Sequence, residues 1–90
     1  MFRMHIKYNG NVQGVGFRWN VFELSKSYIV TGYVKNLASG EVELLVEGKK
    51  SEVFDFVNTL EKKLEDFWYS KKIEIKPEGS HFDRFEIKYI

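Results

Sequence analysis

The chain has 90 residues and a formal net charge of only +1, from 14 Lys and Arg against 13 Asp and Glu, so charge alone indicates no nucleic-acid partner. It contains no cysteine, which excludes disulfides and a thiol nucleophile, and no apolar run long enough to span a membrane. Hydrophobic residues make up 43% of the chain, enough for the core of a single domain over residues 1–90, which we expect to be a cytoplasmic monomer without membrane partners.

The first predicted element is a strand, because apolar and polar residues alternate from Phe2 to Tyr8. A glycine-rich segment, Gly10–Arg18, separates this strand from a predicted helix. The helix is indicated by apolar residues at helical spacing, namely Phe17, Val21, Leu24 and Tyr28. The helix therefore begins where the glycine-rich segment ends.

A hairpin and a second helix are predicted next. Residues 30–36 and 41–47 have strand character and flank the turn residues Leu37–Gly40. Ser51 is expected to cap the N-terminus of the following helix. The apolar stripe of that helix is Val53, Val57, Leu60 and Leu64.

Two further strands are predicted around Ile73–Ile75 and over Phe85–Tyr89, with a turn at Pro77–Ser80 between them. The order βαββαβ followed by a last strand is typical of an α+β ferredoxin-like split βαβ sandwich, which we expect to be an antiparallel sheet with both helices on one face. A helical crossover makes the first two strands parallel, so the glycine-rich loop and the end of the second strand lie at one edge of the sheet. We therefore expect Arg18 and Asn36 to share a pocket.

The glycine-rich segment suits phosphate binding. Glycines allow several backbone N–H groups to approach an anion, the following helix contributes its positive N-terminal end, and Arg18 adds a planar cation. The spacing fits neither a Walker A loop, which requires Gly-Lys-Ser/Thr, nor a dinucleotide fingerprint, which requires a third glycine where Trp19 stands. From the glycines alone, a simple tight connection between strand and helix remains an equal alternative.

Two motifs carry a resemblance to a known family. Val12–Arg18 resembles the first signature of the acylphosphatases, and Gly32–Val42, continuing to Gly48, resembles the second. The resemblance is close over residues 3–60. It departs from the family at Tyr8, where an aliphatic residue is usual, and after Leu64, where the family's Gly-Pro turn is missing and the geometry of residues 65–72 is left undefined.

The resemblance implies a small, metal-independent acylphosphatase without a cofactor. It assigns catalysis to Arg18 and Asn36, and phosphate binding to a loop formed by Gln13, Gly14, Val15, Gly16, Phe17 and Arg18. In this interpretation backbone N–H groups and Arg18 hold the phosphoryl oxygens, and Asn36 orients the attacking water. An acyl phosphate suits such a site because its carboxylate leaving group needs no general acid. Inorganic phosphate, the product, is expected to compete with substrate. His5 and His81 lie too far apart in the sequence for a paired metal site.

Alternatives come from three classes. An acylphosphatase-like module of a carbamoyl-transfer enzyme is expected to precede zinc-finger cysteines and further domains, which this sequence lacks. A ferredoxin-like RNA-binding module needs an aromatic signature on a central strand, whereas Glu41–Glu47 is acidic and aliphatic. A degenerate regulatory module is disfavoured because Arg18 and Asn36 are both present.

Overall fold

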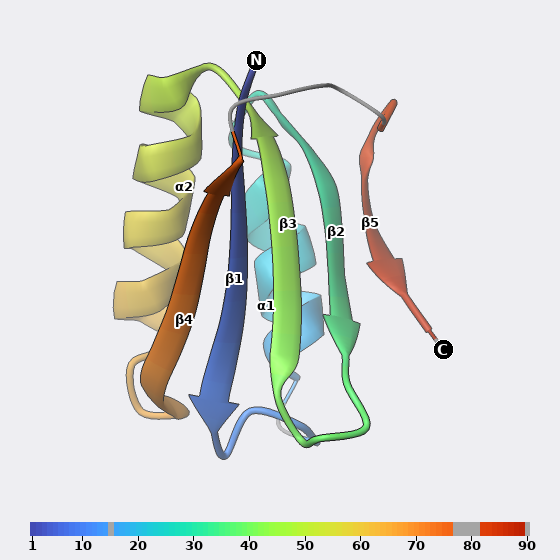
Figure 1. Cartoon of the computed structure of the whole chain (residues 1–90), viewed down its shortest axis with the longest axis vertical. Helices are drawn as coiled ribbons and strands as arrows, with labels where there is room; N and C mark the ends of the chain where they lie inside the picture. Colours follow the sequence, from blue (N-terminus) through green and yellow to red (C-terminus); the bar gives the residue numbers. More distant parts are fainter. Residues whose placement is uncertain (15, 77–81, 90) are drawn as a thin grey trace.

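The computed structural model describes residues 1–14, 16–76 and 82–89. The elements of this part follow the order β1 (Phe2–Gly10), α1 (Phe17–Ser25), β2 (Val30–Asn36), β3 (Val42–Gly48), α2 (Lys50–Lys63), β4 (Trp68–Lys76) and β5 (Phe85–Lys88). The strands form one sheet in the order β4-β1-β3-β2-β5, and both helices lie on the same side of it (Figure 1). The predicted ferredoxin-like α+β fold is confirmed.

Strand direction differs from the expectation in one respect. β3 is antiparallel to both β1 and β2, so β1 and β2 run in the same direction as the helical crossover requires. β5, however, pairs with β2 in parallel, which makes the sheet mixed rather than wholly antiparallel. β4, antiparallel to β1, ends beside the start of β1. β5 begins at the same end of the sheet, on the opposite side, and runs alongside β2 in the same direction (Figure 1).

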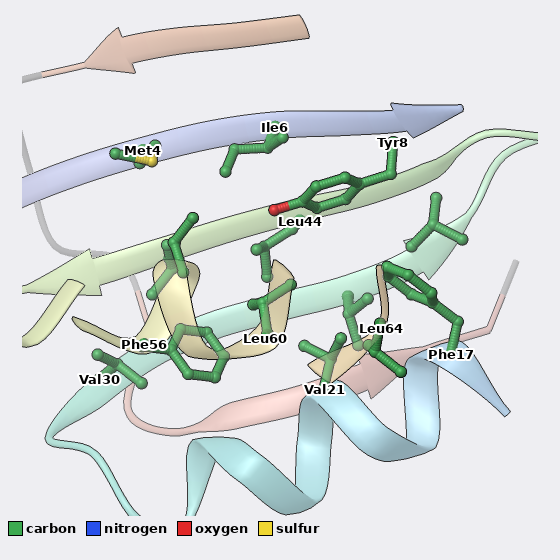
Figure 2. Close-up of a cluster of buried hydrophobic side chains, with 14 of the residues drawn as sticks. Met4, Ile6, Tyr8, Phe17, Val21, Val30, Leu44, Phe56, Leu60 and Leu64 are labelled. Atoms are coloured by element: carbon green, nitrogen blue, oxygen red, sulfur yellow. The ribbon is translucent and has the colours of Figure 1, made fainter. Parts of the chain in front are cut away.

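The core lies between the sheet and the two helices. β1 contributes Met4, Ile6 and Tyr8 from one face, as its alternation predicts, and these side chains are directed toward the helices (Figure 2). The central strand β3 is buried at nearly every position because it has a neighbouring strand on each side. Each helix contributes buried residues from one face, namely Phe17, Val21, Val53, Phe56, Val57 and Leu60, and Leu64 follows at the C-cap of α2.

The start of α2 corrects one expectation. Lys49, not Ser51, occupies the N-cap position, and no side chain caps the helix by a hydrogen bond. The first helical hydrogen bond runs from the N–H of Val53 to the carbonyl of Lys49 at 2.9 Å. Ser51 thus lies inside the first turn, where its hydroxyl cannot take the capping role.

The exit from α2 is held by aromatic side chains instead of a Gly-Pro turn. The indole N–H of Trp68 donates to the carbonyl of Glu61 at 3.0 Å, and the buried Tyr8 donates its hydroxyl to the Glu61 carboxylate at 2.8 Å. Burial and the neighbouring Glu61 charge raise the pKa of Tyr8 well above its usual range. Tyr8 and Trp68 therefore both hold Glu61, near the end of α2, by hydrogen bonds. β4 begins at Trp68. The predicted turn at residues 77–80 lies outside the described residues, as does His81.

The sheet face opposite the helices carries charged pairs. Arg3 pairs with Glu47, and His5 and Tyr33 contact the carboxylate of Glu43 at 2.8 and 3.0 Å. Burial and the hydrogen bond to Glu43 raise the pKa of Tyr33 to about 12. Burial alone would raise the pKa of Glu43, but the hydrogen bonds from His5 and Tyr33, with nearby positive charge, lower it overall.

Neither helix has the length and apolar composition that crossing a membrane requires, among the residues described.

Candidate active site

A pocket of about 160 Å³ opens at the sheet edge where β1, β2 and β5 all end. In Figure 1 this edge is at the bottom, next to the loop between β1 and α1. The pocket is lined by residues from the loop, α1, the end of β2 and the end of β5: Val12, Gly14, Gly16, Phe17, Arg18, Trp19, Asn36, Ile87 and Tyr89. Arg18 and Asn36 therefore share a pocket, as the parallel crossover predicts. Their catalytic roles stay a prediction.

The loop turns through two left-handed glycines. Gly14 has φ 79° and Gly16 has φ 77°, values that L residues with a side chain rarely adopt. Space is not the constraint, because a Cβ on Gly14 would meet nothing within 4 Å. Gly16 is the N-cap of α1, and its carbonyl accepts both the backbone N–H and the side-chain amide of Asn20, at 3.0 and 2.8 Å.

The first turn of α1 is suited to an anion. The N–H groups at a helix N-terminus have no intrahelical acceptor and carry the positive end of the helix dipole. α1 has no acidic residue in this turn, so no carboxylate of its own competes for that end. Gly14, Gly16 and Phe17 of the predicted phosphate loop line the pocket, and their role in phosphate binding stays a prediction. Val15 lies outside the described residues.

Arg18 lies between the loop and the end of the chain. Its Nη1 donates to the carbonyl of Lys88 at 3.4 Å, a long contact, and its guanidinium carbon is 4.9 Å from the centre of the Tyr89 ring. In the described part of the chain no carboxylate forms an ion pair with it. The guanidinium therefore keeps most of its donors available for an anion in the pocket.

Asn36 is the last residue of β2, paired with Val42 of β3. Its Oδ1 is buried and accepts no hydrogen bond from any residue that the structure describes. An unsatisfied buried oxygen costs about 1–3 kcal/mol, so such atoms persist mainly where a ligand or water completes them. This oxygen belongs to a residue that lines the same pocket as Arg18.

Gln13 belongs to the predicted phosphate loop, and its binding role stays a prediction. It does not line the pocket; its side-chain amide donates to the carbonyls of Leu37 and Glu41, at 2.8 and 3.0 Å. It ties the phosphate loop to the β2–β3 hairpin, which carries Asn36. Gln13 therefore sets the distance between the two halves of the site rather than contacting a ligand through its side chain.

Sequence reasoning missed four lining residues, Val12, Trp19, Ile87 and Tyr89. Of these, Trp19 is 57% exposed. Its place directly after Arg18 in a helical first turn was an available signal. Ile87 and Tyr89 reach the site because β5 is parallel to β2, and hydrophobic alternation carries no information on strand direction. Within residues 1–14, 16–76 and 82–89, no group of three or more His, Cys, Asp or Glu is placed to hold a metal ion.

Comparison with known proteins identifies the family. The acylphosphatase family model matches residues 4–87. The acylphosphatase of Bacillus pumilus is 39% identical over 93 residues, covering 98% of this chain and 99% of that protein. The crystal structure of acylphosphatase from Bacillus subtilis superposes with a TM-score of 0.87 at 29% identity, covering 99% of this chain and all of that one.

A second kind of relative is much longer. The probable carbamoyltransferase HypF of Methanocaldococcus jannaschii is 39% identical over 88 residues, which are 98% of this chain but only 10% of that protein. The same fold thus occurs both as a protein of this length and as a small part of a large one. The matches to acylphosphatases support a hydrolase acting on acyl phosphates, and the chain belongs to the acylphosphatase family.

Proposed function

We propose that this protein hydrolyses the carboxyl–phosphate anhydride bond of acyl phosphates, using Arg18 and the loop to hold the phosphoryl group and Asn36 to orient the attacking water. The observation that carries the proposal is that Asn36, whose buried Oδ1 has no hydrogen-bond partner among the described residues, lines the same pocket as Arg18. A water placed there donates one hydrogen to Oδ1 and turns a lone pair toward the phosphorus.

The chemistry of the leaving group makes this small set of residues sufficient. Hydrolysis of a phosphate monoester expels an alkoxide and usually requires a general acid, a metal or a covalent nucleophile. An acyl phosphate expels a carboxylate, whose conjugate acid has a pKa of about 4. Positioning and charge stabilisation then account for the rate, and we expect turnover to be independent of metal ions.

The proposed step balances without a further reactant. The water oxygen forms a new bond to phosphorus while the bond from phosphorus to the bridging oxygen breaks, and both bonding electrons leave with the carboxylate. The Arg18 fork and the loop N–H groups contact the non-bridging oxygens, whose charge they stabilise in the transition state. The asparagine amide is not a basic group, so the water's proton passes to a phosphate oxygen.

The direct test measures phosphate release from benzoyl, acetyl and carbamoyl phosphate, with p-nitrophenyl phosphate as the monoester control. We expect turnover of the acyl phosphates only, unchanged by EDTA and competitively inhibited by inorganic phosphate. Equal cleavage of the monoester, or activity lost to EDTA and restored by added metal, would contradict the proposed mechanism.

A second candidate function is suggested by the likeness to the probable carbamoyltransferase HypF. Carbamoyl phosphate is itself an acyl phosphate, so the same pocket could cleave it as one step of a carbamoyl transfer. The substrate panel separates the two. A strong preference for carbamoyl phosphate favours the transfer role, whereas turnover of several acyl phosphates at comparable rates favours a general acylphosphatase.

A further inference from the structure

The pocket has a polar side and an apolar side. Gly14, Gly16, Arg18 and Asn36 form the polar side, where the proposed function places the phosphoryl group. The apolar side is formed by Val12, Phe17, Trp19, Ile87 and Tyr89. Within it Val12 and Phe17 are buried, but Trp19 is 57% exposed and Tyr89 is 72% exposed. Exposed aromatic surface gathered beside a pocket is typical of a ligand-binding site.

Trp19 is held at the pocket by its own helix. It follows Arg18 in the first turn of α1, and its ring centre lies 6.0 Å from that of Phe22, one helical turn further on. This contact supports one part of the indole and leaves much of the ring exposed. Arg18 and Trp19, which are consecutive residues of α1, therefore both line the pocket.

Tyr89 approaches the pocket from the other end of the chain. Parallel pairing of β5 with β2 brings residue 89 to the edge where β2 ends at Asn36. The Arg18 guanidinium lies over the Tyr89 ring at 4.9 Å, so the phenol ring is fixed beside the proposed phosphate site. Trp19 and Tyr89 thus flank Arg18 from separate elements of the fold.

We propose that Trp19 and Tyr89 form an acyl-group subsite that selects acyl phosphates with aromatic or large apolar acyl groups. The inference rests on the proposed function, because it takes the phosphoryl group to be at Arg18 and the loop. Only one bridging oxygen separates phosphorus from the acyl carbon, so the acyl group must lie next to the residues that flank the phosphate. A phenyl group there covers aromatic surface, whereas an acetyl or carbamoyl group is too small to do so.

The expected effect is a change in selectivity rather than in overall rate. An aromatic contact contributes a factor of about two to ten beyond area burial. Removing either ring should therefore lower the ratio of kcat/KM for benzoyl phosphate to that for acetyl phosphate by about two- to tenfold.

The experiment measures that ratio in the wild type, Trp19→Ala, Tyr89→Ala and Trp19→Phe. Phe54→Ala is the matched control, because Phe54 is a 37% exposed aromatic residue near the start of α2, at the opposite edge of the sheet. We expect the ratio to fall in both alanine variants and to be kept in Phe54→Ala and largely in Trp19→Phe. A ratio unchanged in both alanine variants would overturn the proposal.

A binding measurement separates this proposal from the proposed hydrolysis. Acetylphosphonate and benzoylphosphonate lack the bridging oxygen and cannot be hydrolysed, so their Kd values report the subsite without turnover. Tighter binding of benzoylphosphonate that is lost in Trp19→Ala supports the subsite even if neither acyl phosphate is hydrolysed. Equal weakening of both phosphonates and of inorganic phosphate in Tyr89→Ala and Trp19→Ala would show that the rings act only through Arg18, and would overturn it.

Discussion

The layer between the sheet and the helices contrasts with the pocket at the sheet edge. In the layer, apolar side chains are almost fully buried and contact one another from strands and helices alike (Figure 2). The pocket instead combines left-handed glycines, exposed aromatic rings and a buried amide oxygen that no described residue satisfies. Packing in the first region stabilises the fold, whereas the second region leaves hydrogen-bonding capacity for a ligand. Substitutions should therefore separate stability from activity.

The largest expected effect is at Arg18. By analogy with arginine groups in phosphoryl transfer, Arg18→Ala should reduce kcat/KM about 10³- to 10⁵-fold, or roughly 4 to 7 kcal/mol. Arg18→Lys should be nearly as low, because lysine keeps the charge but loses the planar fork. Steady-state kinetics and phosphate-binding titrations of both variants measure these losses.

The control for Arg18 is Arg84→Ala. The Arg84 side chain is 81% exposed and lies just before β5, at the edge away from the pocket. The Arg84→Ala variant should therefore keep normal kcat and KM. Near-normal activity in Arg18→Lys would show that any cation suffices at the pocket, and near-normal activity in Arg18→Ala would remove the catalytic assignment.

The core should respond in the opposite way. Leu60 is fully buried on α2, so Leu60→Ala should lower the free energy of unfolding by about 2–5 kcal/mol. Activity per folded molecule should be unchanged, because Leu60 does not line the pocket. Denaturant unfolding with parallel kinetics measures both quantities, and Asp55→Ala, an exposed change on the same helix, should alter stability by no more than about 0.5 kcal/mol. A loss of intrinsic activity in folded Leu60→Ala would show that the two regions are coupled.

Asn36→Ala tests the polar end of the pocket. It should fold normally, because Oδ1 accepts no hydrogen bond from the described part of the protein. We expect kcat to fall about 10²-fold or more with a smaller change in KM, since positioning of water acts on the chemical step. Asn58→Ala, an exposed asparagine of α2, is the matched control. Unchanged turnover would remove the catalytic role of Asn36, and a large loss of thermal stability would make its role structural.

Gly14 and Gly40 provide a matched pair of substitutions that tests the backbone of the phosphate loop. Gly14 and Gly40 both have positive φ, 79° and 96°, and a Cβ on either would meet nothing within 4 Å. Alanine at either position should cost about 1–2 kcal/mol of stability through the left-handed backbone. Only Gly14→Ala should also weaken phosphate binding, because Gly14 lines the pocket and Gly40 does not. Calorimetric titration with phosphate distinguishes them, and equal affinities would argue against the loop as the phosphate site.

The smallest expected effect is a pH dependence on the face opposite the helices. Hydrogen bonds from His5 and Tyr33 help lower the pKa of Glu43 below its usual range, although burial of the carboxyl acts in the opposite direction. The unfolded chain then binds a proton at this group more readily than the folded one, so the stabilisation is present above the unfolded pKa and is lost as pH falls through the folded pKa. Glu43→Gln should make the acid decline of stability shallower below about pH 5. Glu65→Gln, an exposed change beyond α2, should leave it unaltered, and identical slopes in both variants would contradict the assignment.

The sequence by itself determined the elements and the two halves of the site. The alternation of apolar residues in β1 and their helical spacing in α1 and α2 predict which side chains are buried, because the spacing of residues along the chain decides which of them share a face of the element. The crossover between β1 and β2 made the meeting of Arg18 and Asn36 predictable. Only the tertiary structure decided the direction of β5, since both directions satisfy the same alternation, and with it the position of Tyr89. It also decided that Gln13 bonds to the hairpin and that Trp19 faces water, because these depend on contacts between segments far apart in the sequence.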